Sequence, residues 1–157
     1  MITLRQAGDA DVSEVRALFR EYAESLDVAL DFQDFENELA SLPGAYSLPG
    51  GCLLLATDGA RSVGCVGVRP LDERTCEMKR LYVRQEARGQ SVGRRLVDEA
   101  IAFARAAGYR AMRLDTLPTM TAARELYRQM GFRDIAPYRY NPIPGTSFME
   151  LMLGDGH

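Results

Sequence analysis

The stretch from Leu81 to Leu96 holds the residues whose types and spacing point most directly to chemistry. A short apolar run leads into a turn that contains Gly89 and Gly93, and the turn opens onto a long amphipathic segment. Backbone N–H groups should therefore converge at a helix start, which is a geometry that binds anions. Five arginines lie in or next to this stretch against a single acid, Glu86: Arg80, Arg84, Arg88, Arg94 and Arg95. Such a bias suits a ligand with several phosphates better than one with a lone carboxylate.

Two familiar phosphate-binding loops do not fit this stretch. A P-loop requires Gly-Lys-Ser/Thr, but Gly93 is followed by Arg94 and Arg95, so a lysine for the terminal phosphates and a hydroxyl for magnesium are both missing. A dinucleotide fingerprint requires glycines at positions 89, 91 and 94, where the chain has Gly89, Ser91 and Arg94. Kinase-like, ATPase-like and dinucleotide-dependent functions are therefore disfavoured.

The remaining pattern, Arg-Gly-Gln-Ser-Val-Gly at 88–93, resembles the acyl-CoA loop of the GNAT superfamily of N-acetyltransferases, which reads Gln/Arg-x-x-Gly-x-Gly/Ala. Arg88 matches the first position and Gly93 the last, and Ser91 stands where glycine is commonest. Serine can still offer its backbone N–H, although it restricts φ more than glycine does. The resemblance implies acetyl-CoA as the acyl donor, with its pyrophosphate held chiefly by the main chain of the loop: Arg88, Gly89, Gln90, Ser91, Val92, Gly93 and Arg94.

The elements that must position this loop follow from hydrophobic periodicity. Runs with strand character cover 2–6, 52–57, 62–68, 75–83, 111–116, 133–136 and 148–153. Stretches with helical spacing cover 12–26, 32–39, 92–107 and 119–130, and Asp11 and Thr119 are the expected N-caps of the first and last of these helices. Short turns join the second, third and fourth strands, which predicts an antiparallel meander. The strand at 111–116 should run parallel to the strand at 75–83, because a long helix joins them.

This order, β-α-α-β-β-β-α-β-α-β-β, is that of the GNAT acyl-CoA N-acyltransferase fold, so the resemblance covers nearly the whole chain. It implies an α/β (α+β) fold with a mixed central sheet of about seven strands flanked by about four helices. Leu126-Tyr127 with Gly131-Phe132 also resembles a second recurrent segment of the superfamily, commonly Asn-x-x-Ala-x-x-Leu-Tyr-x-x-x-Gly-Phe. Met120 stands in place of the usual asparagine of that segment, so no cofactor contact through an amide side chain is expected there.

Composition narrows the domain organisation and the kinds of partner that the protein could have. The chain has 157 residues, of which 46% are hydrophobic and 26% charged, and this suits one globular domain spanning residues 1–157. No apolar run approaches the length of a membrane span, and the N-terminus begins with a strand-like alternation instead of a leader, so we expect a cytoplasmic protein without a membrane partner. A formal net charge of −3 argues against nucleic-acid binding. The sequence leaves the oligomeric state open, a homodimer included.

The cysteines and the single histidine disfavour several catalytic classes. Cys52, Cys65 and Cys76 each lie in an apolar run, which is typical of buried thiols in a reducing compartment. The only histidine is His157, the last residue, so we expect neither a histidine-based triad nor a metal site. Chemistry must therefore come from carboxylates, tyrosines, backbone amides or the cofactor.

The strand at 75–83 carries an irregularity in its alternation. Cys76 and Met78 are apolar in one phase and the residues at 81 and 83 in the other, so the pattern slips across 79–80. Such a slip favours a β-bulge, which separates neighbouring strands and leaves main-chain groups unpaired. A regular strand with an inward tyrosine at 82 is the alternative. In the GNAT superfamily a comparable bulge opens a slot for the pantetheine arm, and the matching positions are Leu81, Tyr82 and Val83.

The resemblance also implies direct attack of a neutral amine on the acetyl thioester. Glu77, just upstream of the slot, is the best candidate on the sequence for the proton acceptor, directly or through water, and a solvated strand carboxylate is the alternative. A main-chain N–H near Leu81 or Tyr82 would stabilise the oxyanion. Tyr127 is the candidate acid for the leaving thiolate, with a core tyrosine as the alternative.

Specificity for the acceptor should come from the first two helices and from the late aromatic segment. Tyr46, Tyr138, Tyr140 and Asn141 are candidate walls of the acceptor site. Five acids near the second helix could attract a cationic amine, although such charges are more often simply solvated: Asp27, Asp31, Asp34, Glu36 and Glu38.

Two functions from different classes remain. The first is an acetyl-CoA-dependent N-acetyltransferase that acts on a primary amine of a small molecule or peptide. The second is a non-catalytic module that binds acyl-CoA as a sensor, favoured by Ser91 and Met120 at motif positions. In both, Arg80 and Arg84 could reach the 3′-phosphate of the cofactor or make no contact with it. Turnover of an amine would separate the two functions.

Overall fold

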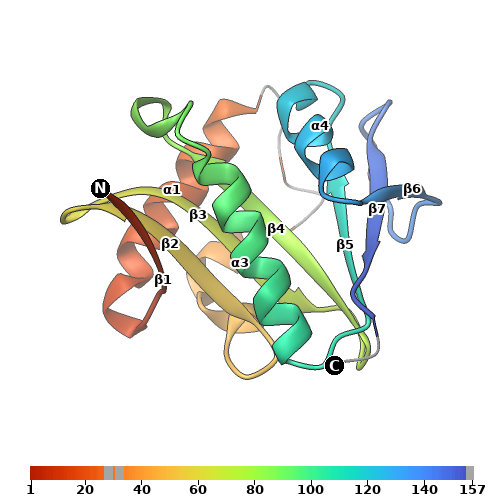
Figure 1. Cartoon of the computed structure of the whole chain (residues 1–157), viewed down its shortest axis with the longest axis horizontal. Coiled ribbons are helices and arrows are strands. Elements are labelled where there is room, and N and C mark those ends of the chain that lie inside the picture. Colours follow the sequence, from red (N-terminus) through yellow and green to blue (C-terminus); the bar gives the residue numbers. More distant parts are fainter. Residues whose placement is uncertain (27–29, 31–33, 155–157) are drawn as a thin grey trace.

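The computed structural model describes residues 1–26, 30 and 34–154, and its centre is a mixed sheet of seven strands (Figure 1). The order across the sheet is β1-β2-β3-β4-β5-β7-β6. The strands are β1 (Ile2–Gln6), β2 (Cys52–Asp58), β3 (Arg61–Pro70), β4 (Thr75–Val83), β5 (Ala111–Thr116), β6 (Arg133–Ile135) and β7 (Ser147–Met152). The α-helices of the described residues are α1 (Val12–Ser25), α2 (Phe35–Ser41), α3 (Val92–Ala106) and α4 (Thr121–Gln129).

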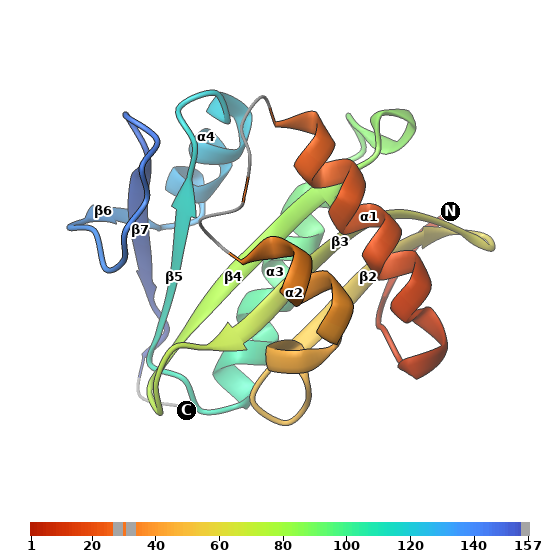
Figure 2. The ribbon, with the colours of Figure 1, turned by 180° about the vertical axis from the view of Figure 1, so that it is seen from behind.

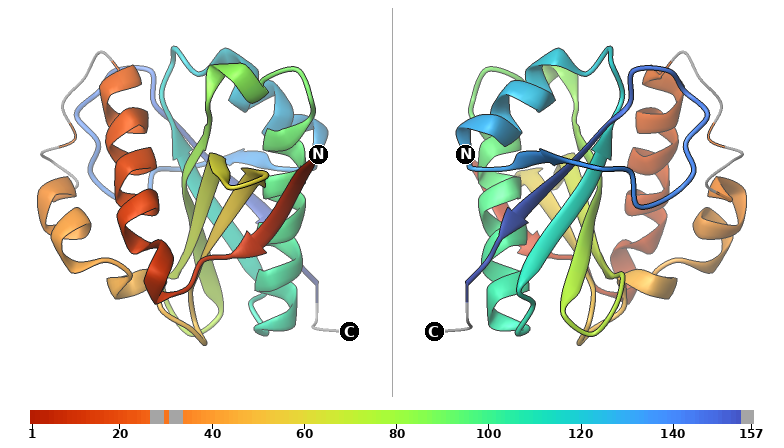
Figure 3. Two further views of the ribbon diagram at one scale, coloured as in Figure 1. Left: turned by 90° about the vertical axis from the view of Figure 1, so that its left-hand side faces the viewer. Right: turned by 90° about the vertical axis from the view of Figure 1, so that its right-hand side faces the viewer.

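The sheet combines an antiparallel and a parallel part. β1 to β4 form an antiparallel meander, β4 and β5 run parallel, and β7 pairs antiparallel with both β5 and β6. α3 and α4 cover one face of the sheet (Figure 1), and α1 and α2 cover the opposite face of the meander (Figure 2). Viewed along its edge, the sheet lies between these two layers of helices (Figure 3).

Each face of the sheet has its own apolar core. On the α3 face, Leu96 and Val97 of the helix pack with strand residues such as Val66 and Met112. The core of the α1 face is built from helix and strand residues: Val15, Leu18, Phe19, Leu39, Leu53, Leu55 and Cys65. Neighbours in a strand, such as Cys65 and Val66, thus contribute to opposite cores, as expected for strands buried on both faces. The three cysteines are buried with free thiols, and burial raises the pKa of each.

The predicted order of elements, the antiparallel meander and the parallel crossover through α3 are all confirmed. β4 and β5 coincide with the predicted runs at 75–83 and 111–116. α3 ends just before Gly108, whose φ of 91° is the left-handed conformation expected of a C-terminal glycine. These agreements concern the elements that frame the predicted anion loop.

Two residues that were predicted as helix N-caps do not cap their helices through a side-chain hydrogen bond. α4 begins at Thr121, so Met120 and not Thr119 occupies its N-cap position, because a turn closed by the Met120 N–H and the Leu117 carbonyl precedes the helix. Asp11 precedes α1, but its carboxylate accepts from Arg5 and from the N–H of Gly8 and makes no cap bond. Phe32, expected in the second helix, lies outside the described residues. Within the ranges that the structure describes, every helix is too short or too polar to cross a bilayer.

Candidate active site

β4 and β5 separate along their length. They pair over only three residues of each strand, 75–77 with 111–113, although β4 continues to Val83 and β5 to Thr116. The main-chain groups of β4 beyond residue 77 therefore have no ladder partner on the β5 side. Groups of this kind require another bonding partner when they are withdrawn from water.

β4 carries a β-bulge in the segment beyond its pairing with β5. Lys79 lies opposite Gly67 of β3, and Tyr82 lies opposite Cys65, so β4 has one residue more than β3 between these pairings. Arg80, inside the bulge, adopts a left-handed backbone with a φ of 63°. The bulge predicted from the slip across 79–80 is thus confirmed.

Arg80 is held in this conformation by residues of the α2 region. Its Nε and Nη2 atoms donate to the two carboxylate oxygens of Glu38 at 3.0 and 2.9 Å, and its guanidinium carbon lies 5.0 Å from the centre of the Phe35 ring. Burial disfavours both charges, yet their mutual bonds raise the pKa of Arg80 and lower that of Glu38, so both remain ionised. This pairing offsets a backbone conformation that is otherwise unfavourable for an L-residue.

A cleft of about 610 Å³ lies where β4 and β5 diverge, and it is bordered by residues from both faces of the sheet. On the α3 side its walls include Leu81, Val83, Gly93, Leu126 and Tyr127. On the α1 side they include Tyr22, Leu26, Leu30, Lys79, Arg80 and Asp115. Lys79 and Asp115 belong to the second group because their strand neighbours Met78 and Leu114 face the α3 core.

The predicted anion loop lies at the α3 side of this cleft. Arg88 and Gly93 line the cleft, and α3 begins at Val92, directly after the loop. Gly89 and Ser91 both have a left-handed backbone, with φ of 83° and 60°. The N–H groups in the first turn of α3 have no acceptor within the helix and therefore point out of its N-terminus.

The side chains of the loop fall into three groups. Those of Gln90 and Arg94 are exposed, whereas Val92 is buried in the α3 core. Arg88 donates from Nε to the main-chain oxygen of Val83 at 3.0 Å, which joins the loop to the end of β4. The loop thus offers main-chain N–H groups beside the end of β4, which pairs with β3 but not with β5.

Tyr127 of α4 forms part of the wall between the two sides. Its side chain is buried, and its ring centre lies 5.6 Å from that of Phe132, because the chain turns back at Gly131. Burial raises the pKa of Tyr127, with smaller contributions from Tyr22 and Asp115, so its hydroxyl is protonated at neutral pH. Burial likewise raises the pKa of Tyr22, across the cleft, to about 12.

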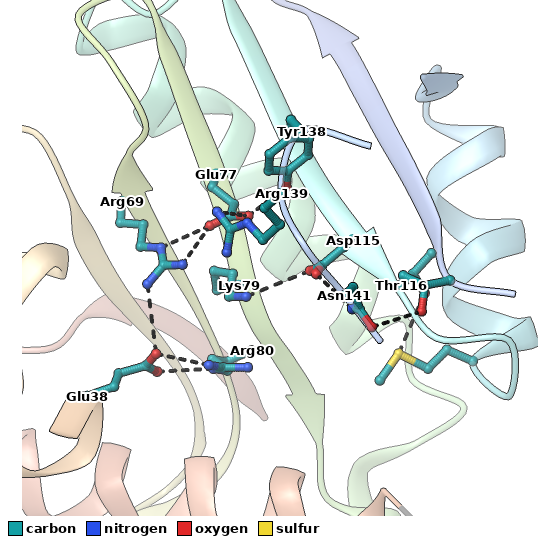
Figure 4. A network of polar contacts seen from close by, with 12 residues as sticks. Glu38, Arg69, Glu77, Lys79, Arg80, Asp115, Thr116, Tyr138, Arg139 and Asn141 are labelled. Atoms are coloured by element: carbon teal, nitrogen blue, oxygen red, sulfur yellow. Dashed lines mark hydrogen bonds and ion pairs between the residues drawn. The ribbon is translucent and has the colours of Figure 1, made fainter. Parts of the chain in front are cut away.

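Glu77 is fully buried, but it is not among the residues that line the cleft. One of its carboxylate oxygens accepts from Arg69 Nε at 2.9 Å. The other accepts from the Tyr138 hydroxyl at 2.6 Å and lies 2.8 Å from Nη2 of Arg139 (Figure 4). With both oxygens engaged, Glu77 anchors the segment at 138–139 to the sheet, and this argues against its expected role as proton acceptor.

Of the four candidate walls of the acceptor site, the structure places Asn141 at the cleft. Tyr46 is buried beneath α2, where its hydroxyl donates to Glu38 at 3.1 Å. Tyr138 is held by Glu77, and Tyr140 is 75% exposed. The late aromatic segment therefore reaches the cleft through its asparagine, while its tyrosines lie outside the cleft lining.

Lys79 and Asp115 are cleft residues to which the sequence analysis assigned no role. Their side chains are 3% and 8% exposed, and Nζ of Lys79 lies 3.7 Å from Oδ1 of Asp115 (Figure 4). Burial and the neighbouring Arg80 lower the pKa of Lys79 to about 8. Among the described residues that line the cleft, Asp115 is the only carboxylate. A usable signal existed, since Asp115 lies near the carboxyl end of a parallel strand, where ligand sites gather.

The other charged candidates have partners within the protein. Arg84 donates through two N–H groups to Glu21, and Arg80 does the same to Glu38, which argues against the expected contacts to a 3′-phosphate. Glu36 is exposed, and Asp34 borders a separate cavity beside α2. The acids Asp27 and Asp31 lie outside the described residues.

Comparisons with known proteins agree with this geometry. The sequence model of the acetyltransferase (GNAT) family matches residues 12–132. An uncharacterized N-acetyltransferase of Schizosaccharomyces pombe is 41% identical over 145 residues, which cover 91% of this chain and 89% of that protein. An acetyltransferase of the GNAT family from Staphylococcus aureus has a similar structure, with a TM-score of 0.81 at 20% identity over 98% of this chain and 99% of that one. A Salmonella typhimurium protein solved with its cofactor acetyl-CoA has a TM-score of 0.75 at 23% identity, over 97% and 94% of the two chains.

Proposed function

Since the chain belongs to the GNAT family of acetyltransferases, we propose that it transfers the acetyl group of acetyl-CoA to a primary amine of a small molecule or peptide. Membership makes it an acyltransferase, and the acceptor is the part that the proposal adds. The observation that carries the proposal is the cleft between β4 and β5, which reaches both faces of the sheet and has a helix N-terminus at one side.

The α3 side of the cleft suits coenzyme A. The first turn of α3, with Gly89 and Ser91 in left-handed conformations before it, offers N–H donors for a pyrophosphate. The main chain of 81–83 has no ladder partner from β5, so it can bond the amides of a pantetheine arm as an added strand would. When bound there, acetyl-CoA would supply an activated thioester beside the bulge.

The α1 side of the cleft suits the amine. Asp115 is the carboxylate that faces this space, so we assign it the role of proton acceptor in place of Glu77. Tyr127 faces the same space from α4 with a protonated hydroxyl. A main-chain N–H of the bulge, at Leu81 or Tyr82, would donate to the oxyanion.

These residues account for each bond and proton in the transfer. The acceptor ammonium gives one proton to Asp115, and the neutral nitrogen attacks the thioester carbonyl carbon. A C–N bond forms and the C–S bond breaks, and Tyr127 donates its proton to the departing thiolate. The second amine proton restores the Tyr127 hydroxyl, and Asp115 returns its proton to solvent.

Release of free thiol from acetyl-CoA in the presence of an amine tests this assignment. Asp115→Asn should lower kcat about 100-fold and Tyr127→Phe about 10-fold, because general acid–base groups contribute on this order and a thiolate leaves fairly readily. Tyr140→Phe, which changes an exposed tyrosine, is the matched control and should retain wild-type turnover. Wild-type turnover in Asp115→Asn would show that another group accepts the proton.

The same assay addresses a sensor function for the site. The left-handed Ser91 and the N-cap Met120 stand where GNAT motifs more often have glycine and asparagine, and these two positions favour that second candidate. Tight binding of acetyl-CoA without thiol release on a broad panel of amines would support it. Family membership supports the enzyme.

A further inference from the structure

We infer that Asn141 is a positioning residue of the transfer reaction, which holds the Asp115 carboxylate in the orientation that accepts the proton of the amine. The inference rests on the proposed function, because Asp115 is the proton acceptor assigned there. It gives a role in the reaction to the segment at 138–145, called the late segment below. Its basis is the hydrogen bonding of the Asn141 side chain, which uses both ends of the amide.

The two ends of the Asn141 amide have different partners. Its side-chain oxygen accepts from the main-chain N–H of Ile143 at 2.9 Å and from the Thr146 hydroxyl at 3.4 Å, which closes a turn. Its side-chain nitrogen donates to Oδ2 of Asp115 at 3.4 Å (Figure 4). The reversed amide would set its NH2 group against a main-chain N–H and its oxygen against a carboxylate. These partners therefore fix which end of the amide faces Asp115.

The turn alone does not account for an asparagine at position 141. Closing the turn requires a side-chain oxygen, which aspartate and serine offer as well. Aspartate would direct its second oxygen towards Asp115, where two carboxylates repel each other. Serine would have no second polar group to reach that carboxylate. The amide of Asn141 closes the turn and at the same time donates to Asp115.

Before Asn141, the late segment is attached to the sheet through Tyr138. The Tyr138 hydroxyl donates to the buried Glu77 at 2.6 Å (Figure 4). The guanidinium carbon of Arg113, in β5, lies 5.6 Å from the centre of the Tyr138 ring. Arg113 and Asp115 lie on the same face of β5, because alternate residues of a strand point to one side. The late segment thus follows β5 from Arg113 to Asp115.

After Asn141, the late segment is attached to the end of β5 through Arg124 of α4. Its Nη2 atom donates to the main-chain oxygen of Thr116 at 2.9 Å and to that of Gly145 at 2.7 Å. Thr116 directly follows Asp115 in the chain. Asn141 is therefore held between two attachments, and the fold sets its place beside Asp115.

A neutral donor suits a carboxylate that must take a proton. A carboxylate has about four lone-pair sites, so the Asn141 N–H can orient Asp115 and leave sites open to the amine. The other oxygen of Asp115 lies 3.7 Å from Nζ of Lys79, which is longer than a hydrogen bond. Because the orientation of a base towards the reacting nitrogen affects the chemical step, loss of Asn141 should lower kcat more than it raises KM.

Substitution of Asn141 by aspartate separates this role from that of a turn residue. Asn141→Asp keeps an oxygen for the Ile143 N–H but sets a carboxylate oxygen against Asp115, so kcat should fall by more than about 10-fold. Thiol release from acetyl-CoA measures this, with benzylamine, ethanolamine, spermidine and leucine as acceptors. Asn37→Asp is the matched control and should keep wild-type kcat, because Asn37 also donates to an aspartate, Asp34 at 2.8 Å, but does not line the cleft.

Combination with Asp115→Ala tests whether Asn141 acts through Asp115. Alone, Asn141→Ala should lower kcat about 10-fold, as expected for one hydrogen bond to a charged group, and leave the KM for acetyl-CoA unchanged. In the Asp115→Ala background, the same substitution should change kcat by less than about twofold. A residue that only supports the fold would lower kcat by the same factor in both backgrounds.

Nuclear magnetic resonance measures the contact without turnover. Asn37 and Asn141 are the two asparagines of the chain, so isotopically labelled asparagine gives two pairs of side-chain amide signals, and Asn37→Asp assigns them. Asp115→Ala should shift the Asn141 pair, because it removes the carboxylate to which that amide donates, and leave the Asn37 pair in place. This measurement decides if a variant of Asn141 does not fold.

The outcomes separate this inference from the proposed function. Wild-type kcat in Asn141→Asp, equal effects of Asn141→Ala in the two backgrounds, or an Asn141 signal that does not respond to Asp115→Ala overturns the inference. Binding of acetyl-CoA without turnover of any of these amines supports a sensor and also overturns it. Wild-type kcat in Asp115→Ala, or a wild-type protein that does not bind acetyl-CoA, overturns the proposed function instead.

Discussion

Lys79 connects the cleft to the stability of the protein through its proton. An unfolded lysine holds its proton up to a pH of about 10, whereas burial lowers the pKa of Lys79 in the folded protein to about 8. Between these values the unfolded chain binds more protons, so the free energy of unfolding rises with pH. Below the folded pKa the side chain is charged, and the folded state carries the net cost of burying that charge.

Comparison with Lys79→Met isolates this effect. The free energy of unfolding of the wild type, relative to that of the variant, should rise by on the order of 2 kcal/mol between about pH 7 and about pH 10. Urea denaturation of both proteins across this range measures the difference, and the tyrosines and cysteines that both share cancel. A difference that stays constant with pH would mean that Lys79 titrates as an exposed lysine does.

Glu77 and Asp115 show how far single residues could be assigned from the sequence. Both are strand carboxylates beside the slot, and the sequence favoured Glu77 because of its place before the bulge. The choice depends on partners that are remote in the sequence: Arg69 comes from β3, and Tyr138 and Arg139 follow β6. Tyr127 was easier to place, since its helical spacing put it on the buried side of α4, and its catalytic role stays a prediction.

An ion pair from α2 supports the bulge in β4. Glu38→Gln would replace the carboxylate that receives the Arg80 fork with a neutral amide and leave a buried guanidinium poorly compensated. We expect the free energy of unfolding to fall by about 3 kcal/mol, in line with the loss of one partner from a buried pair. The midpoint of urea denaturation, at an unchanged slope, measures this.

Glu36→Gln provides the matched control on the same helix. The Glu36 side chain is 75% exposed and lies 3.8 Å from Arg20, so its loss should change the free energy of unfolding by less than about 0.5 kcal/mol. Equal shifts in the two variants would contradict a special role of the Arg80 pair in holding the bulge.

The sequence predicted a structural feature where that feature depends on residues close together in the chain. The phase slip of alternation predicted the bulge, and glycines before an amphipathic run predicted the anion loop. The start of α4 was missed because a main-chain turn at 117–120, which leaves no mark on the hydrophobic pattern, delays the helix. The place of β7 between β5 and β6 was not predicted either, since strand order depends on contacts between distant segments.

The arrangement of the whole sheet predicts a sequential kinetic mechanism, in which both substrates bind before the acetyl group is transferred. Acetyl-CoA is assigned to the α3 side of the cleft and the amine to the α1 side, so both can be bound at once. Initial velocities measured against both substrates should give intersecting lines in double-reciprocal plots, as expected for a ternary complex. Acetyl-CoA alone should leave the mass of the protein unchanged. Parallel lines, or an added acetyl group, would instead indicate an acetylated intermediate.

The short pairing of β4 with β5 has a consequence for inhibitor chemistry. A compound that joins the acceptor amine to coenzyme A would have to be narrow where it crosses between the two strands, while both of its ends could be enlarged. Nucleotide-side groups would confer affinity shared with other members of the family. Selectivity for this protein would come from groups placed on the α1 side of the cleft, beside Asp115 and Asn141.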